Sequence, residues 1–153
     1  MFLGAVAATD LFVCDNIWKP KGKGDVAMAL VFDEAQIRAA LKEAWSLETA
    51  VQWTEENPAL GQCNVTAAVI EDLFGGEILR TALPGVMHYY NRIDGQTIDF
   101  TDSQFSGPGS VFEAPSSYDH ELTTHDAAMV GIPRREFDTL KEALIKELSD
   151  PTR

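Results

Sequence analysis

The stretch of residues 61–104 constrains the fold more than any other part of the sequence. An apolar run over residues 65–74 ends at a Gly-Gly pair, which is typical of a helix terminus. Two strand-like segments follow, residues 86–93 and 96–100, and an Asp-Gly pair joins them in the manner of a two-residue hairpin. This order predicts a helix packed on an antiparallel hairpin, and therefore an α+β fold.

Segments on either side complete the predicted fold. Asp33 followed by Gln36 indicates a helix start, and apolar residues at i, i+4 and i+8 continue that helix to Trp45. A second short helix is indicated from Ser46, carrying Val51 and Trp53. The remaining predictions are a strand over residues 77–81, a Gly-, Pro- and Ser-rich loop over 106–117, a segment over 118–131 that fits helix or strand, and a helix over 134–148.

The length of 153 residues fits one domain. Within residues 1–153 we expect an N-terminal extension (1–32), a core (33–105), a loop-rich segment (106–131) and a C-terminal helix (132–153). The apolar residues 1–13 lack a basic start and contain Asp10, so they do not resemble a signal peptide. No apolar run approaches the roughly 20 residues of a membrane span. We expect a cytoplasmic protein.

The net charge argues against two classes of partner, and the cysteine content indicates the redox compartment. The formal net charge is −12, with 24 acidic against 12 basic residues. Such a chain is a poor ligand for nucleic acid or for an anionic membrane surface, because both attract clusters of Lys and Arg. The two cysteines, Cys14 and Cys63, do not form a disulfide framework and fit a reducing compartment.

A candidate catalytic group lies within the central stretch. Cys63 stands at the predicted start of a helix, where the helix dipole stabilises a thiolate. A two-residue Asp-Gly loop would pair Ile93 with Gln96, and this register places His88 and Asp99 on one sheet face, about 7 Å apart between backbones. With Cys63 on the same side of the sheet, the three residues would form a nucleophile, its base and an orienting carboxylate.

The same group leaves two interpretations open. In the catalytic one, either the backbone amide of Cys63 or the side chain of Gln62 donates to the oxyanion of the reacting carbonyl. In the structural one, Cys63 is inert packing, and His88 is a buried histidine whose hydrogen bond Asp99 satisfies.

Short motifs around these residues resemble known families. Gly61-Gln62-Cys63 is similar to the nucleophile motif of transglutaminases, and Asp99-Phe100-Thr101 is similar to the end of their aspartate strand. This resemblance implies a Cys-His-Asp triad in that chain order on a transglutaminase-like (papain-like) core. Asn64 stands where those enzymes usually have tryptophan, and Cys63 lies closer to His88 in sequence than in full-length transglutaminases.

A closer resemblance is to the YunG-like family of small, uncharacterised bacterial proteins, and it covers about half of the chain, up to Phe105. The shared pattern comprises Ala44-Trp45-Ser46, Glu48-Thr49, Asn57-Pro58, Gly61-Gln62-Cys63, Gly75-Gly76-Glu77-Ile78, His88-Tyr89-Tyr90-Asn91-Arg92, Asp99-Phe100-Thr101 and Gln104-Phe105. The family implies no established substrate.

No pattern points to a cofactor or a metal. His120 and His125 are five residues apart instead of four, so they would point to different sides of a helix and a zinc site is not expected. The sequence contains no phosphate-binding loop and no dinucleotide-binding glycine motif.

The sequence thus predicts a cysteine-dependent acyl-transfer enzyme on an α+β fold. Its substrate would carry an amide or an ester, and the reaction would be amide hydrolysis, deamidation or transamidation, which share their first steps. The alternative is a non-catalytic acidic binding or interaction domain of the same fold.

Overall fold

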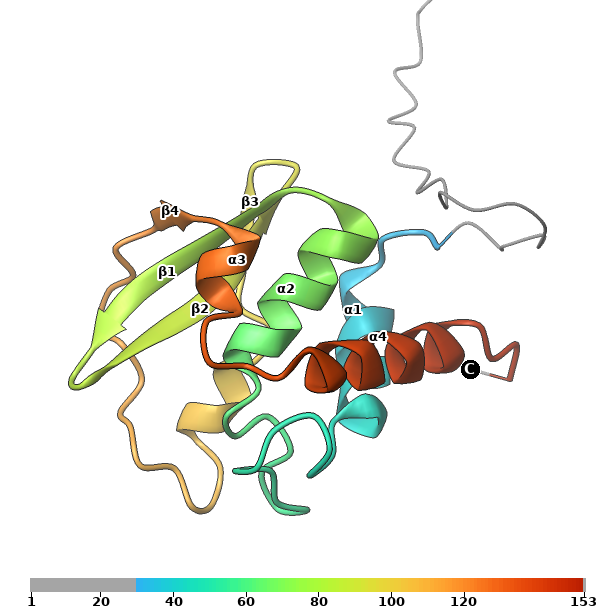
Figure 1. Cartoon of the computed structure of the whole chain (residues 1–153), viewed down its shortest axis with the longest axis horizontal. Coiled ribbons are helices and arrows are strands. Elements are labelled where there is room, and N and C mark those ends of the chain that lie inside the picture. The colour runs from blue at the N-terminus through green and yellow to red at the C-terminus, as the bar shows by residue number, and fades with distance from the viewer. Residues whose placement is uncertain (1–29, 153) are drawn as a thin grey trace, which may run out of the picture.

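The computed structural model describes residues 30–152, and the structural statements below refer to these residues. In chain order its elements are α1 (Glu34–Ala44), α2 (Cys63–Phe74), β1 (Glu77–Leu83), β2 (Val86–Ile93), β3 (Gln96–Ile98), the 3-10 helix η1 (Asp102–Phe105), β4 (Glu121–Thr123), α3 (His125–Ala128) and α4 (Arg134–Leu148) (Figure 1). Helices and an antiparallel sheet make this an α+β fold, as predicted.

The four strands form one sheet in the order β3-β2-β1-β4, and each neighbouring pair is antiparallel. The predicted hairpin register is confirmed, since Ile93 pairs with Gln96 and Asn91 with Ile98. Asp94 adopts the positive φ, 49°, that tight two-residue turns of this kind require. β3 pairs only with residues 91–93, so the part of β2 before them has no partner on its β3 side.

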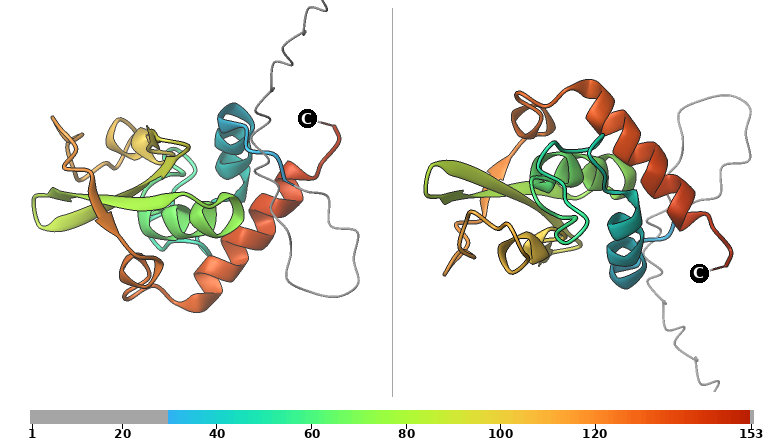
Figure 2. Two further views of the ribbon diagram at one scale, coloured as in Figure 1. Left: turned by 90° about the horizontal axis from the view of Figure 1, so that it is seen from above. Right: turned by 90° about the horizontal axis from the view of Figure 1, so that it is seen from below.

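α2 lies between the sheet on one side and α1 and α4 on the other (Figure 1). It packs on the sheet face that carries Tyr89 and Asn91, and the Asn91 side-chain amide donates to the Ala67 carbonyl at 2.9 Å. α3 covers the same face, while η1 lies across the opposite face (Figure 2). His88 and Tyr90 alternate with Tyr89 and Asn91 and therefore project toward the η1 side.

Local sequence signals fix the ends of the central elements. Gln36 N donates to the Asp33 side chain at 2.9 Å, which confirms the predicted helix start. α2 ends at Gly75, and Gly76 then passes so close to β2 that a Cβ there would lie 2.5 Å from the Arg92 carbonyl oxygen. The Gly-Gly pair therefore ends the helix and also permits its close return to the sheet.

The structure differs from the sequence predictions at three places. The predicted helix after Ser46 is wrong: this segment forms turns, in which the Thr49 hydroxyl bonds the Ser46 backbone and competes with helix formation. β1 extends past Thr81 to Leu83 because β2 pairs with it to its end, and β3 stops at Ile98. The ambiguous segment 118–131 contains β4 and α3.

The predicted N-terminal extension (1–32), including Cys14, lies almost entirely outside the described residues. Within the described part of the chain, no helix combines the length and apolar character needed to cross a membrane.

Candidate active site

Cys63 is the first residue of α2, as the sequence predicted, and its residue is 9% exposed. The turn that precedes it is closely packed. A Cβ on Gly61 would lie 2.4 Å from the Gln52 side chain, so a larger residue would displace the turn that leads into the helix. The thiol is therefore held at the positive end of a helix of 12 residues.

His88 and Asp99 are in direct contact. His88 Nε2 lies 2.6 Å from Asp99 Oδ2, and the two side chains are 2% and 9% exposed. The second carboxylate oxygen, Oδ1, accepts from the amide and the hydroxyl of Thr101 at 2.9 and 3.0 Å. The Asp-Phe-Thr sequence thus forms a local turn that fixes the orientation of the Asp99 carboxylate.

The electrostatics of this pair favour a protonated imidazole. Burial by itself lowers the pKa of His88, but hydrogen bonds to Asp99 and to Cys63 outweigh it and raise that pKa to about 9. Burial likewise opposes the charge on Asp99, yet the bonds to His88, Thr101 and Tyr118 hold its pKa below the usual range. At neutral pH the site therefore contains an imidazolium and a carboxylate.

Cys63 lies near His88, but its helix packs on a different side of the sheet from the one that the sequence predicted. α2 packs on the sheet face opposite to the one from which His88 projects, whereas we expected Cys63 and His88 on the same side. The thiol is nevertheless close enough to the imidazole to contribute to the raised pKa of His88. Because β2 has no partner on its β3 side next to His88, the two groups can meet at this open edge of the sheet.

Asn64 is the second polar neighbour of the thiol. Its side-chain amide donates to the Ala128 carbonyl at 2.9 Å, and this bond turns its Oδ1 toward Cys63, whose Sγ lies 3.3 Å away. Asn64 thus links the Cys63 thiol to α3.

Gln62 does not have the arrangement expected of an oxyanion donor. Its side chain is fully buried, and Nε2 donates to the Ser46 carbonyl at 3.4 Å. Its Oε1 is buried without a hydrogen-bond partner. The amide group that was expected to face a substrate is instead directed at the Ser46 carbonyl in the turns before α2.

Aromatic side chains cover the His88–Asp99 pair. Phe105 approaches the imidazole edge-on at 4.9 Å between ring centroids, and the Tyr118 hydroxyl donates to Asp99 Oδ2 at 2.9 Å. Sequence reasoning missed both residues as parts of the site. They flank the Gly-, Pro- and Ser-rich loop, where no periodicity shows which side chain turns inward.

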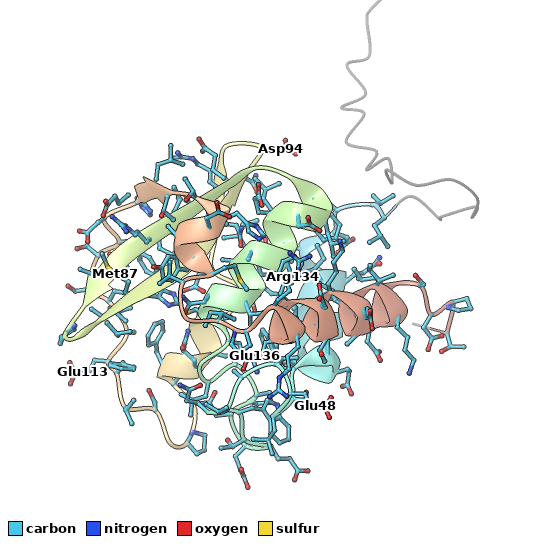
Figure 3. The ribbon with its side chains drawn as sticks, viewed as in Figure 1. Glu48, Met87, Asp94, Glu113, Arg134 and Glu136 are labelled. Carbon is cyan, nitrogen blue, oxygen red and sulfur yellow. The ribbon has the colours of Figure 1, made fainter. Side chains whose placement is uncertain are left out.

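The Gly-, Pro- and Ser-rich loop over residues 106–117, called the covering loop below, also borders a surface hollow of about 560 Å³. The hollow lies between the end of the β1–β2 hairpin, at Leu83 and Pro84, and the loop segment that carries Glu113, which Figure 3 labels. Its lining does not include Cys63, His88 or Asp99. The surface next to the site is therefore recessed, while the site itself is covered.

The other histidines have separate partners. His120 Nδ1 lies 3.1 Å from the Tyr90 hydroxyl, and His125 Nδ1 lies 3.1 Å from Glu71 Oε2. Among residues 30–152 no cluster of three or more His, Cys, Asp or Glu side chains is arranged to hold a metal ion.

Comparison with known proteins gives the family. A family model described as YunG protein matches residues 33–149. The chain belongs to the YunG family. It is 36% identical over 113 residues to "Uncharacterized protein YunG" of Bacillus subtilis (strain 168), a match that covers 74% of this chain and 92% of the relative. No solved structure matches the chain.

The family match confirms the YunG-like resemblance and extends it. The sequence pattern ended at Phe105, whereas the match with the YunG family continues through the covering loop, α3 and α4. Cys63, His88, Asp99 and Tyr118 all lie within it.

Proposed function

We propose that the protein is a cysteine-dependent acyl-transfer enzyme with a transglutaminase-like (papain-like) core. The observation that carries this proposal is the position of His88, which is hydrogen-bonded to Asp99 and close enough to Cys63 for the thiol to contribute to its raised pKa. A buried histidine that needed only one partner would be satisfied by Asp99 alone. Contact with a thiol at a helix start adds the nucleophile that acyl transfer requires.

In the proposed reaction, Cys63 Sγ attacks the carbonyl carbon of an amide or ester. His88, which is already protonated at neutral pH, holds the proton that the thiol has lost and passes it to the leaving amine or alcohol as the carbon–nitrogen or carbon–oxygen bond breaks. Asp99 holds the tautomer of His88 and stabilises the imidazolium. Water or an amine attacks the resulting thioester and gives its proton to His88, and the sulfur leaves as the thiolate, which restores the starting ion pair with His88.

The oxyanion of the intermediate would be stabilised by the first turn of α2. The leading amides of a helix have no acceptor within the helix, and the Cys63 amide is the one nearest to the nucleophile. Gln62 is a weaker candidate because its amide group is engaged with Ser46. We therefore assign the donor role to the backbone of Cys63.

The low solvent exposure of the site supports one alternative to the enzymatic function. With His88 at 2% and Asp99 at 9% exposure, the same contacts would also suit a non-catalytic acidic interaction domain in which the three residues are architectural. The two functions differ in one property: an enzyme requires a reactive thiol at Cys63, whereas an interaction domain does not.

Labelling with iodoacetamide, followed by peptide mass mapping, tests the proposal. We expect Cys63 to react faster than Cys14 at pH 7, and we expect His88→Gln and Asp99→Asn each to slow Cys63 by about tenfold or more. The melting temperature of each variant shows whether it is folded. Equal labelling of the two cysteines in the wild-type protein, or unchanged Cys63 labelling in both folded variants, would favour the interaction domain.

A further inference from the structure

Tyr118 is hydrogen-bonded to the carboxylate of Asp99. Its hydroxyl donates to Asp99 Oδ2 at 2.9 Å, and this is the same oxygen that lies 2.6 Å from His88 Nε2. Because Oδ1 is already occupied by Thr101, the Tyr118 bond completes the coordination of the carboxylate. Asp99 therefore receives donors from three directions, and two of them meet at one oxygen.

Packing holds the Tyr118 ring in this position. The ring lies edge-on to Tyr90, with 4.9 Å between centroids and planes at 87°, and stacks on His120 at 6.1 Å and 14°. His120 is in turn fixed to β2, since its backbone amide donates to the Tyr90 hydroxyl at 3.0 Å. The orientation of the Tyr118 hydroxyl is thus set by β2, the strand that carries His88.

Tyr118 also remains a hydrogen-bond donor across the working pH range. Burial and the neighbouring Asp99 both raise the pKa of Tyr118 above its ordinary value, so the phenol stays protonated. A neutral donor on the carboxylate withdraws part of the negative charge that the imidazolium would otherwise receive.

We propose that Tyr118 is a positioning residue of the site: its hydroxyl holds the Asp99 carboxylate against His88 and reduces the affinity of His88 for its proton. The catalytic meaning of this role rests on the proposed acyl-transfer function, but the coupling between Tyr118 and His88 does not. Removing the hydroxyl should leave a carboxylate that attracts the imidazolium more strongly and is less well fixed. His88 should then titrate at higher pH, and acyl transfer should slow.

Other charged and titratable groups around the pair are unchanged by this substitution. Those that face His88, Asp99 or Tyr118 are Cys63 from α2, Tyr90 from β2, Asp102 from η1, and Asp119 and His120 from the segment before β4. None of these other groups donates to Asp99 Oδ2 in the described structure, so Tyr118→Phe isolates the bond of interest.

NMR titration of the full-length protein labelled at histidine tests the proposal. The chain has three histidines, so His88 can be assigned with single His→Gln variants. We expect Tyr118→Phe to raise the titration midpoint of His88 by about half a pH unit, and to lower the rate of Cys63 alkylation several-fold. Tyr90→Phe is the comparison variant: its hydroxyl bonds His120 and the Arg80 carbonyl instead of Asp99, so it acts on Tyr118 only indirectly and we expect a smaller rise than in Tyr118→Phe.

The outcomes separate the two proposals. An unchanged or lowered His88 midpoint in folded Tyr118→Phe overturns the role of Tyr118, as does an equal rise in Tyr90→Phe. A raised midpoint in a protein whose wild-type Cys63 reacts no faster than Cys14 supports the coupling and counts against the enzyme. A raised midpoint together with slowed alkylation of a reactive Cys63 supports both.

Discussion

At the scale of single residues, the sulfur of Cys63 has two polar neighbours. One is Asn64 Oδ1, at 3.3 Å, and the other is the imidazolium of His88. A hydrogen bond from S–H to Asn64 stabilises the neutral thiol, whereas the positive charge of His88 stabilises the thiolate that the proposed reaction requires. Because Asn64 is itself held by the Ala128 carbonyl, its oxygen cannot easily turn away.

We therefore predict that Asn64→Ala accelerates the alkylation of Cys63. The expected gain is about two- to tenfold, which corresponds to the loss of one hydrogen bond of roughly 0.5–1.5 kcal/mol. Rates measured at pH 7 with iodoacetamide would show it. The same substitution in a His88→Gln background should give no gain, because the thiolate would have no imidazolium to stabilise it. A slower reaction in Asn64→Ala alone would contradict this account and make Asn64 a supporting residue of the nucleophile.

Sequence reasoning predicted the contacts that depend on backbone register and missed those that depend on loops. The Asp-Gly turn fixed the pairing of β2 and β3, and the contact between His88 and Asp99 follows from it. Tyr118 lies 19 residues beyond Asp99, across a loop whose Gly and Pro residues allow many paths. The direction of the Gln62 amide was equally inaccessible, because it depends on a carbonyl in the turn before α2.

At the scale of elements, the link between α2 and β1 controls where the nucleophile lies relative to the sheet. Gly76 is in contact with β2 through the Arg92 carbonyl, and it has a φ of +86°. Any side chain at this position would push β1 away from β2 or rotate the end of α2. A shift there would pass along the helix to Cys63 at its other end.

We predict that Gly76→Ala destabilises the protein more than Gly95→Ala. Both glycines have positive φ, but the space beside Gly95 is open, with no atom within 4 Å of an added Cβ. The difference in the free energy of unfolding should be about 1–3 kcal/mol, the usual cost of overpacking. Urea unfolding of the two variants would measure it. Equal destabilisation would mean that the backbone at Gly76 shifts to accommodate the Cβ with no further loss in the free energy of unfolding.

The same scale shows why some elements were predicted and others were not. α2 and α4 have apolar stripes long enough to define a helical period, and their predicted positions agree with the structure. β4 has three residues and α3 has four, too few for any period to emerge, so their conformations are set by pairing with β1 and packing on α2.

At the scale of the whole molecule, the ion pair in the site links stability to pH. The pKa of His88 rises from an ordinary value of 6.5 to about 9 on folding, so the folded protein binds this proton more tightly than the unfolded chain does. The stabilisation is complete below pH 6.5 and is lost as the pH rises through about 9. For Asp99 the pKa falls on folding, so its contribution is present above the ordinary value of 3.8 and is lost as the pH falls below it.

We predict that the melting temperature of the wild-type protein declines between pH 6.5 and pH 9, and that this decline is smaller in His88→Gln. Asp99→Asn should also reduce it, because the imidazolium loses its main partner. Differential scanning calorimetry over this range would measure the slopes. Identical slopes in the wild-type protein and His88→Gln would show that His88 titrates in the folded state as it does in the unfolded chain.

The packing of α1 on α4 has a consequence for the synthesis of the protein. All the side chains of the site lie between residues 63 and 118, and their contacts span short stretches of chain, such as the 11 residues between His88 and Asp99. α1, by contrast, is the first helix of the described chain, and its main helical partner, α4, is the last. Since the chain leaves the ribosome from its N-terminus, Ile37 and Leu41 emerge about a hundred residues before Leu140 and Leu144, which share their apolar cluster. The nascent chain therefore carries α1 without its α4 partner until Leu140 and Leu144 have left the ribosome, and a ribosome that stalls before α4 would release a chain prone to aggregation.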